Sequence, residues 1–307
     1  MVKGIEIVDA HMHILTARSN SRIRQRLAER DEGYRRAFAL WSEGFQKKYN
    51  SELGEENNDP PEKIAQDWAE ELDLHEVDKA VFVSLYPEED ELTEVVQAKR
   101  ERFFAFATVD PKDPKAPELL RRRVLEEGYV GLKLYPTTMG FLPSDRSVYP
   151  VYEECRSLGI PVLLHLGITL QYESDLRFAN PLELHPVLKD FPEVPFIIAH
   201  FGAGYFREVL FLAYHVNNLY VDTCGKNVWI EYLPYRITLS QVFERSLEVF
   251  GPERIIFGTD SRMLSRGYRK AVLDQQLSIL RSLELGREEI SLIMGANILR
   301  LIEGAKT

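Results

Sequence analysis

Two histidines near the start of the chain have the spacing to bind one metal ion. His11 and His13 lie in the segment 9–13 (DAHMH), directly after the apolar run 5–8. That run predicts a β-strand. Side chains of a strand alternate between its faces, so both imidazoles should project the same way, about 7 Å apart. The alternative is that they are ordinary polar residues at a strand end. Two imidazoles alone leave a metal ion under-coordinated, so the chemistry needs further ligands.

Further candidates interrupt or end apolar runs later in the chain. These polar residues are Lys133, His165, His200 and Asp260. Taken singly, each has a simpler explanation. His165 or His200 could be a hydrogen-bonded core histidine, Asp260 could cap a helix, and Lys133 could pair with a buried acid or bind an anion. Together they predict a site only if the fold brings the strand ends to one place.

The apolar runs predict the fold that would do this. Eight of them occur, and helix-like stretches lie between most of them. A parallel sheet is indicated, and eight such units indicate a (β/α)8 TIM barrel, in which the C-terminal strand ends form one rim. A doubly wound open sheet is the alternative, but no glycine-rich phosphate turn follows an early strand. The predicted strands are 5–13, 80–84, 103–108, 130–134, 161–165, 195–200, 219–222 and 254–260. The main predicted helices are 118–127, 148–158, 181–189, 240–250, 270–283 and 287–302.

The segment 14–78 is too long for an ordinary connection within a barrel. It contains a helical stretch over 21–49, an acidic loop over 50–59, and a helix that begins at Pro60. We therefore expect one domain, 1–307, with a helical insert over 14–78 that lies above the C-terminal end of the first strand. Trp41 and Phe45 of this insert either cover the site as a lid or form the insert's own small core.

Composition excludes several classes of function. The net charge of −10 argues against a nucleic-acid partner. No apolar run reaches 18 residues, so we expect no membrane span. The strand predicted next to the first residue leaves no room for a signal peptide. Two cysteines, Cys155 and Cys224, do not make a disulfide framework, so we expect a reduced, cytoplasmic protein.

Five short motifs resemble the amidohydrolase superfamily, and more closely its amidohydrolase-related branch, which includes aminocarboxymuconate-semialdehyde decarboxylase. The resemblance runs from residue 5 to about residue 300, although the common motif does not predict the insert. The motifs are DAHMH at 9–13, GLKLYP at 131–136, VLLH at 162–165, HFG at 200–202 and FGTD at 257–260.

The resemblance implies a role for each motif residue. His11, His13 and His165 would be nitrogen ligands of a metal ion, and Asp260 would be an oxygen ligand and proton shuttle. His200 would orient a metal-bound water or polarise the substrate. The implied cofactor is one divalent metal, Zn²⁺ in the first place, with Mn²⁺ or Fe²⁺ as alternatives.

Lys133 matches the position where binuclear members have a bridging carboxylated lysine. Because the closer branch is usually mononuclear, we expect an unmodified lysine near a single metal. Tyr135, Arg177 and Arg262 lie in or near predicted strand–helix loops, and with Lys133 they are candidate contacts for a small anionic substrate.

Three functions remain open from the sequence. The first is a metal-dependent hydrolase that uses a metal-activated water on a small molecule. The second is a metal-dependent, non-oxidative decarboxylase of an aromatic or muconate-like acid. The third is a zinc-stabilised barrel that binds a ligand without turnover. Any homodimer would form through helices or the insert, because a closed barrel has no free strand edge.

Overall fold

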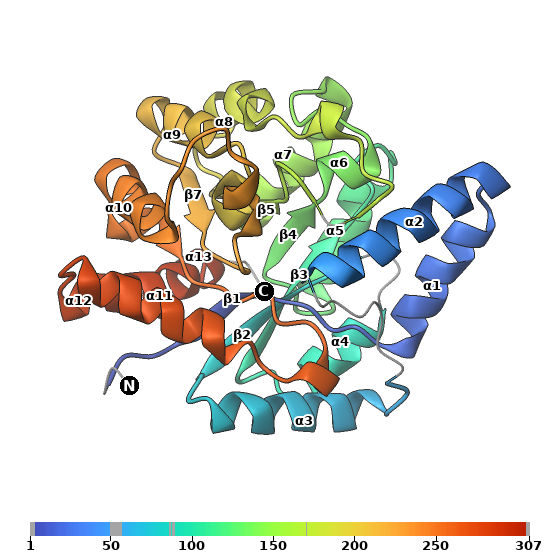
Figure 1. Ribbon diagram of the computed structural model, residues 1–307, viewed down its shortest axis with the longest axis horizontal. Coiled ribbons are helices and arrows are strands. Elements are labelled where there is room, and N and C mark those ends of the chain that lie inside the picture. The colour runs from blue at the N-terminus through green and yellow to red at the C-terminus, as the bar shows by residue number, and fades with distance from the viewer. Residues whose placement is uncertain (1–3, 50–56, 86, 88–89, 170, 305–307) are drawn as a thin grey trace.

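Eight parallel strands form a barrel in the computed structural model, which describes residues 4–49, 57–85, 87, 90–169 and 171–304. Each strand pairs with the next one in the chain, so the sheet order is β1 to β8, with helices around the outside (Figure 1). The predicted (β/α)8 fold is confirmed. The strands are β1 (Val8–Met12), β2 (Lys79–Val83), β3 (Phe103–Thr108), β4 (Gly131–Leu134), β5 (Val162–Leu164), β6 (Phe196–Ile198), β7 (Leu219–Asp222) and β8 (Ile255–Ile256).

The first strand is shorter than expected. It spans Val8–Met12, whereas the predicted strand began at Ile5 and ended near His13, so His11 lies within β1 and His13 directly follows it. The backbone N–H of Ala10 donates to the carbonyl of Phe257 (3.0 Å), which joins the segment after β8 to β1. The two ends of the chain's sheet therefore meet at the strand that carries the histidine pair.

The strands are buried on both faces, as a barrel enclosed by helices requires. Large rings such as Phe82, Phe103 and Phe106 are almost completely buried. Close packing leaves no spare room at Gly131 on β4, because an added Cβ would lie 2.5 Å from the ring of Phe106. The barrel thus has a dense core of its own, and the polar residues concentrate at one rim.

The helices predicted over 118–127, 148–158, 240–250 and 270–283 are present with similar bounds, whereas α4, α6 and α9 were not among the predicted ranges. The helix predicted over 287–302 is interrupted by a π-helical turn at Leu292–Ala296. A capping box, in which Thr238 and Gln241 bond each other's backbone N–H, begins the helix before β8. The helices are α3 (Pro61–Leu74), α4 (Asp90–Gln97), α5 (Ala116–Leu125), α6 (Pro136–Met139), α7 (Tyr149–Leu158), α8 (His185–Asp190), α9 (Phe206–His215), α10 (Leu239–Phe250), α11 (Lys270–Ser282), α12 (Arg287–Ser291) and α13 (Asn297–Ile302).

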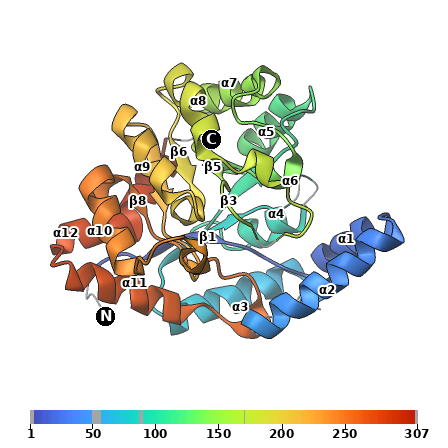
Figure 2. The same ribbon diagram turned by 45° about the horizontal axis from the view of Figure 1, so that its top comes forward.

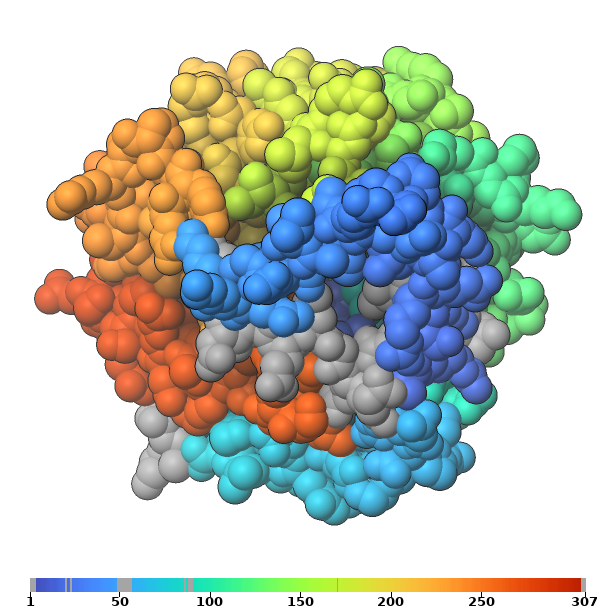
Figure 3. All heavy atoms as spheres, turned by 45° about the vertical axis from the view of Figure 1, so that its right-hand side comes forward, coloured from blue at the N-terminus to red at the C-terminus, as the bar shows by residue number. Residues whose placement is uncertain are grey.

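The expected insert divides into two parts. The stretch predicted as one helix over 21–49 consists of α1 (Ala17–Ala28) and α2 (Glu32–Tyr49), which we call the arm. The arm projects from the barrel in Figures 1 and 2, and it forms a blue ridge across one face of the molecule in Figure 3. By contrast, α3 buries Trp68 against Phe82 of β2, so it is a wall helix of the barrel. Most of the predicted acidic loop, residues 50–56, lies outside the described residues.

Within the part of the chain that the structure describes, none of the helices combines the length and the apolar character that crossing a membrane requires.

Candidate metal centre

The histidine pair on β1 presents two nitrogen atoms with free lone pairs. His11 and His13 are both buried, and their rings lie 5.2 Å apart. His11 donates from Nδ1 to Oδ2 of Asp222 (2.7 Å), and His13 donates from Nδ1 to the carbonyl of Val83 (2.9 Å). Because these partners can only accept, both Nε2 atoms are left unprotonated in the neutral rings. Burial lowers the pKa of His11 to about 3 and also lowers the pKa of His13, so both rings are neutral.

Asp260 approaches this pair from the loop that follows β8. Its backbone N–H donates to the carbonyl of His11 (2.9 Å), and its φ of 58° is left-handed. One carboxylate oxygen, Oδ1, lies 3.4 Å from Nε2 of His13, and the other accepts a hydrogen bond from Arg269 (2.9 Å). Burial alone would raise the pKa of Asp260, but Arg269 and His13 hold it well below its usual value. The side chain therefore faces the histidines as a carboxylate.

These three residues fit a divalent metal ion. One ligand atom from each of His11, His13 and Asp260 lies within 4.8 Å of the other two. Two of these atoms, Nε2 of the neutral His13 and Oδ1 of Asp260, are both acceptors and face each other without a proton to share. A cation between them would resolve this contact, and imidazole nitrogen with carboxylate oxygen is a common ligand set for zinc and related metals.

His165 and His200 extend the group of imidazoles beyond the triplet. His165 donates from Nε2 to the carbonyl of Ile168 (3.1 Å), which leaves its Nδ1 free, and its ring lies 4.9 Å from that of His200. Burial lowers the pKa of His165 well below its usual value. Within the described residues a second group of three ligand atoms, from His11, His200 and Cys224, also lies within 4.8 Å of one another, and His165 belongs to neither group. Its role as a fourth ligand stays a prediction.

His200 sits on a strained turn directly after β6. Its φ and ψ are 55° and 38°, and Phe201 beside it is also left-handed. The ring lies 5.3 Å from that of His11, and its Nδ1 donates to the carbonyl of Cys224 (3.0 Å). Left-handed conformations of non-glycine residues are unfavourable and are often found at functional sites. The turn aims a free Nε2 at the rim where the other histidines gather.

Two residues of this region were not predicted from the sequence. Asp222, the last residue of β7, binds His11, and Cys224 places its sulfur 3.0 Å from Nδ1 of both His11 and His200. A signal for Asp222 was present, since it ends an apolar strand just as His165 does. Cys224 had no such signal, because a cysteine in an apolar region is usually a packing residue.

Lys133 is buried beside the imidazoles. Its Nζ has no hydrogen-bond partner among the described residues, and it lies 4.9 Å from the centre of the Tyr135 ring. Burial lowers the pKa of Lys133 to about 8, although Asp222, Cys224 and Asp260 act in the opposite direction. Tyr135 in turn stacks against His165, with ring centres 6.5 Å apart, and donates to the carbonyl of Ser84. An unpaired buried ammonium group is costly, which points to an anion that binds there.

The two predicted arginines occupy very different places. Arg262 is half-buried. Burial lowers the pKa of its guanidinium group, whereas the nearby carboxylate of Asp260 acts in the opposite direction. Arg177 is exposed, and its guanidinium group pairs with Asp175 two residues earlier. The structure thus brings Arg262 to the rim, whereas the Arg177 guanidinium binds a local carboxylate at the surface.

The arm contacts two of the loops at this rim. Tyr172, seven residues after His165, packs against Tyr34, Phe38 and Trp41 of α2, with ring centres 5.3 Å, 5.8 Å and 5.5 Å apart. At the other end of α2, Lys48 bonds the hydroxyl of Tyr232 (2.8 Å) in the turn after β7. Trp41 also stacks on Phe45, so these rings are at once the arm's own small core and its contact with the barrel.

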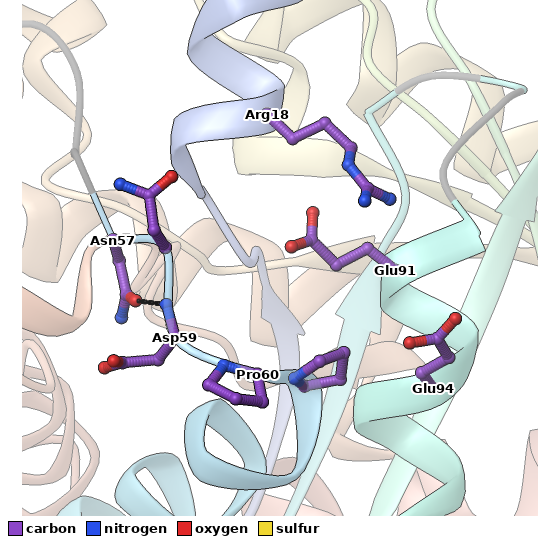
Figure 4. A pocket seen from close by; sticks show the side chains of 8 residues that line it. Arg18, Asn57, Asp59, Pro60, Glu91 and Glu94 are labelled. Atoms are coloured by element: carbon purple, nitrogen blue, oxygen red, sulfur yellow. Dashed lines mark hydrogen bonds between the residues drawn. The ribbon is translucent and has the colours of Figure 1, made fainter.

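Two cavities lie near the arm. One, of about 240 Å³, is lined by Arg26 of α1 together with Tyr135, Thr138 and Gln171, so it borders the rim on the outer side of Tyr135. The other, of about 270 Å³, lies where α1, α3 and α4 begin, and Arg18 and Glu91 face each other across it (Figure 4). No histidine lines either cavity.

Known structures share this fold over nearly their whole length. The chain is 14% identical to 5-carboxyvanillate decarboxylase LigW from Sphingomonas paucimobilis, with a TM-score of 0.68 over 98% of this chain and 99% of that one. A 5-carboxyvanillate decarboxylase from Novosphingobium aromaticivorans, solved with manganese and a nitrobenzoic acid, is 13% identical (TM-score 0.66, 98% and 97%). A probable 2-pyrone-4,6-dicarboxylic acid hydrolase from Acinetobacter baumannii, solved with citric acid, is 15% identical (TM-score 0.63, 97% and 100%).

Sequence comparison identifies the family. No curated protein matches the chain significantly. A family model described as amidohydrolase matches residues 8–303, which include every histidine and carboxylate of the proposed centre. The chain therefore belongs to the amidohydrolase family.

Proposed function

We propose that this protein is a metal-dependent hydrolase of a small anionic molecule. The observation that carries the proposal is the convergence of His11, His13 and Asp260, whose ligand atoms lie within 4.8 Å of one another at the rim. His165 completes the proposed ligand set, with its free Nδ1 available. Zinc is the first candidate, and manganese, which a similar structure contains, is the second.

The side chains around the centre have distinct tasks in this proposal. When bound, the ion would lower the pKa of a coordinated water toward about 7 and polarise an oxygen of the substrate. Asp260 accepts a proton at its carboxylate, which Arg269 keeps ionised, and returns it to the leaving group. His200, whose Nδ1 donates to the carbonyl of Cys224, accepts a hydrogen bond at Nε2 and so orients the attacking water or a substrate hydroxyl.

An anionic substrate is supported by the cations at the rim. Lys133 offers a buried ammonium group, and Arg262 offers a half-buried guanidinium group. A carboxylate between them would satisfy both, and the stacked ring of Tyr135 would form one wall. Arg177 stays a prediction, since its guanidinium would have to leave Asp175 to reach the same molecule.

Decarboxylation is the second candidate, and the structural neighbours favour it. Two of the similar structures are decarboxylases of an aromatic acid, and one was solved with manganese and an aromatic acid. The same residues could serve this reaction. Lys133 would bind the substrate, and Asp260, a carboxylate at rest, would relay a proton taken up from solvent to the ring carbon that loses carbon dioxide. The third candidate, a zinc-stabilised binding protein, predicts bound metal and no turnover. A cytoplasmic location and a homodimer also remain proposals.

Isotope incorporation separates the two reactions. The metal-loaded protein is incubated in ¹⁸O-water with a panel of lactones and aromatic or muconate-like acids, and product mass and released carbon dioxide are measured. Label in the product without carbon dioxide supports hydrolysis, whereas carbon dioxide without label supports decarboxylation. Bound metal without turnover of any substrate would favour the binding protein.

The metal centre is tested by a pair of histidine variants. We expect His13→Ala to lose most bound metal in elemental analysis while it keeps its circular-dichroism spectrum, because the barrel has its own core. His215→Ala, at an exposed position at the end of α9, is the matched control and should keep the metal. Full metal content in His13→Ala would refute the ligand assignment.

A further inference from the structure

We propose that Asp222 is a positioning residue, which fixes the tautomer of His11 and holds the backbone turn that carries His200. The functional value of this arrangement rests on the proposed metal centre, but the tautomer of His11 can be tested without metal. Asp222 ends β7, is 1% exposed, and contributes no atom to either group of possible ligands.

The two oxygens of this carboxylate bind two different parts of the centre. Oδ2 accepts the Nδ1 proton of His11 (2.7 Å), while Oδ1 accepts the backbone N–H of His200 (2.7 Å) and that of Cys224 (3.2 Å). One side chain on β7 therefore connects a residue of β1 with the turn after β6. Since His11 must give its proton to Asp222, its Nε2 keeps the lone pair that a metal needs.

The carboxylate also stabilises the unusual backbone at His200. A left-handed histidine is unfavourable unless its surroundings hold it in place. The hydrogen bond from His200 N to Oδ1 lies at the first residue of the left-handed pair His200 and Phe201. Asp222 thus acts on two imidazoles at once, through the ring of one and the backbone of the other.

Hydrogen-bond geometry supports a carboxylate that accepts at both oxygens. Three N–H groups converge on Asp222: the Nδ1–H of His11 at Oδ2, and the backbone N–H groups of His200 and Cys224 at Oδ1. An ionised carboxylate accepts at both oxygens and cannot donate. It is therefore the form that can serve His11 and His200 simultaneously.

Replacement by asparagine makes a sharp prediction, because an amide has one acceptor and one donor. If its oxygen faces His200 N–H, its NH₂ group faces Nδ1 of His11. His11 can then accept at Nδ1 only if its proton moves to Nε2, which removes the lone pair aimed at the centre. If the amide is reversed, its NH₂ group faces the His200 N–H, and two donors are opposed in a buried place.

The experiment compares Asp222→Asn with Thr223→Val. Thr223 is the next residue, is fully buried, and bonds Gln276 through its hydroxyl (2.6 Å), so its loss tests burial and strand-end packing without touching an imidazole. Proteins labelled with ¹⁵N in their histidine rings report the tautomer of His11 in the metal-free state. Calorimetric titration with Mn²⁺ and with Zn²⁺ reports metal affinity.

We expect wild type and Thr223→Val to keep the Nδ1–H tautomer at His11 and to bind each metal with affinities within about threefold of one another. Asp222→Asn should show the Nε2–H tautomer and bind metal about 10- to 100-fold more weakly, the usual effect of losing such a partner. An unchanged tautomer with unchanged affinity would overturn the proposal.

Two further outcomes keep the test decisive. If Asp222→Asn does not fold, the wild-type spectrum still decides, because an Nε2–H tautomer at His11 contradicts the inference. If wild type binds no metal but shows the Nδ1–H tautomer, and Asp222→Asn switches it, the inference holds and the metal-dependent function fails.

Discussion

Tyr172→Ala should release the arm from the barrel. Tyr172 lies in the loop after β5, and its ring contacts Tyr34, Phe38 and Trp41 of α2. At the other end of α2, Lys48 bonds the hydroxyl of Tyr232, lies 4.6 Å from the centre of its ring and pairs with Glu231 (3.6 Å). The Lys48 and Glu231 side chains are half exposed or more, so their ion pair contributes little.

The size of the effect follows from these contacts. An aromatic pair contributes about 0.5–1.5 kcal/mol beyond the area that it buries, so three pairs contribute roughly 1.5–4.5 kcal/mol if they are independent. Since about 1.4 kcal/mol changes an equilibrium tenfold, the open form of the arm should become about 10- to 1000-fold more populated. Contacts that share one ring are not fully additive, so the lower half of this range is expected.

Hydrogen exchange measures this population directly. Amides of α2 should exchange about 10- to 100-fold faster in Tyr172→Ala, while those of the barrel strands keep their protection. Tyr214→Ala, at an 86% exposed tyrosine on α9, is the matched control and should leave α2 unchanged. If exchange in α2 is the same in Tyr172→Ala as in wild type, the contacts of Tyr172 do not hold the arm against the barrel, and the reasoning is refuted.

Three further predictions concern the centre itself. Gly258→Ala would place a Cβ 2.9–3.0 Å from the Cβ atoms of Cys224 and His11. It should therefore lower the free energy of unfolding in denaturant by about 1–3 kcal/mol and weaken metal binding. Gly44→Ala, with open space around it, is the control and should do neither. Because the pKa of Lys133 is lowered to about 8, a carboxylate inhibitor should bind more weakly as pH rises through 8. Lys133→Met should bind this inhibitor weakly at every pH. A wild-type inhibition constant that does not change between pH 7 and 9 would exclude Lys133 as the group that binds the carboxylate. Asp260→Asn should remain folded by circular dichroism and lose turnover by a factor of about 10²–10⁴, and near-normal turnover would remove Asp260 from the mechanism.

The sequence predicted the barrel and its rim because apolar periodicity reports burial directly. Short apolar runs that alternate with helical stretches are typical of strands buried on both faces, and a histidine or aspartate at the end of such a run stands out. His11, His13 and Asp260 were found in this way, and the structure brings them together. Asp222 also ends an apolar strand, β7, so the sequence carried the same signal for this residue.

Other features depend on information that periodicity does not carry. Helical spacing in 14–78 shows that one face is covered, but not by what, so α3 of the barrel wall could not be separated from the arm. Backbone handedness at His200 is set by the bond to Asp222, 22 residues away. The side chain of Arg177 was placed near the substrate because of its loop, whereas the carboxylate of Asp175 two residues earlier pairs with it.

The left-handed backbone at His200 and Asp260 sets a limit on how this protein could be made more heat-resistant. Glycine adopts that geometry without the Cβ clash, so replacing either residue by glycine would relieve strain and delete a functional group in the same step. Selection for thermal tolerance alone should therefore enrich inactive barrels at these two positions. Improved resistance to heat with retained turnover would have to come from elsewhere, such as the exposed surface of the arm.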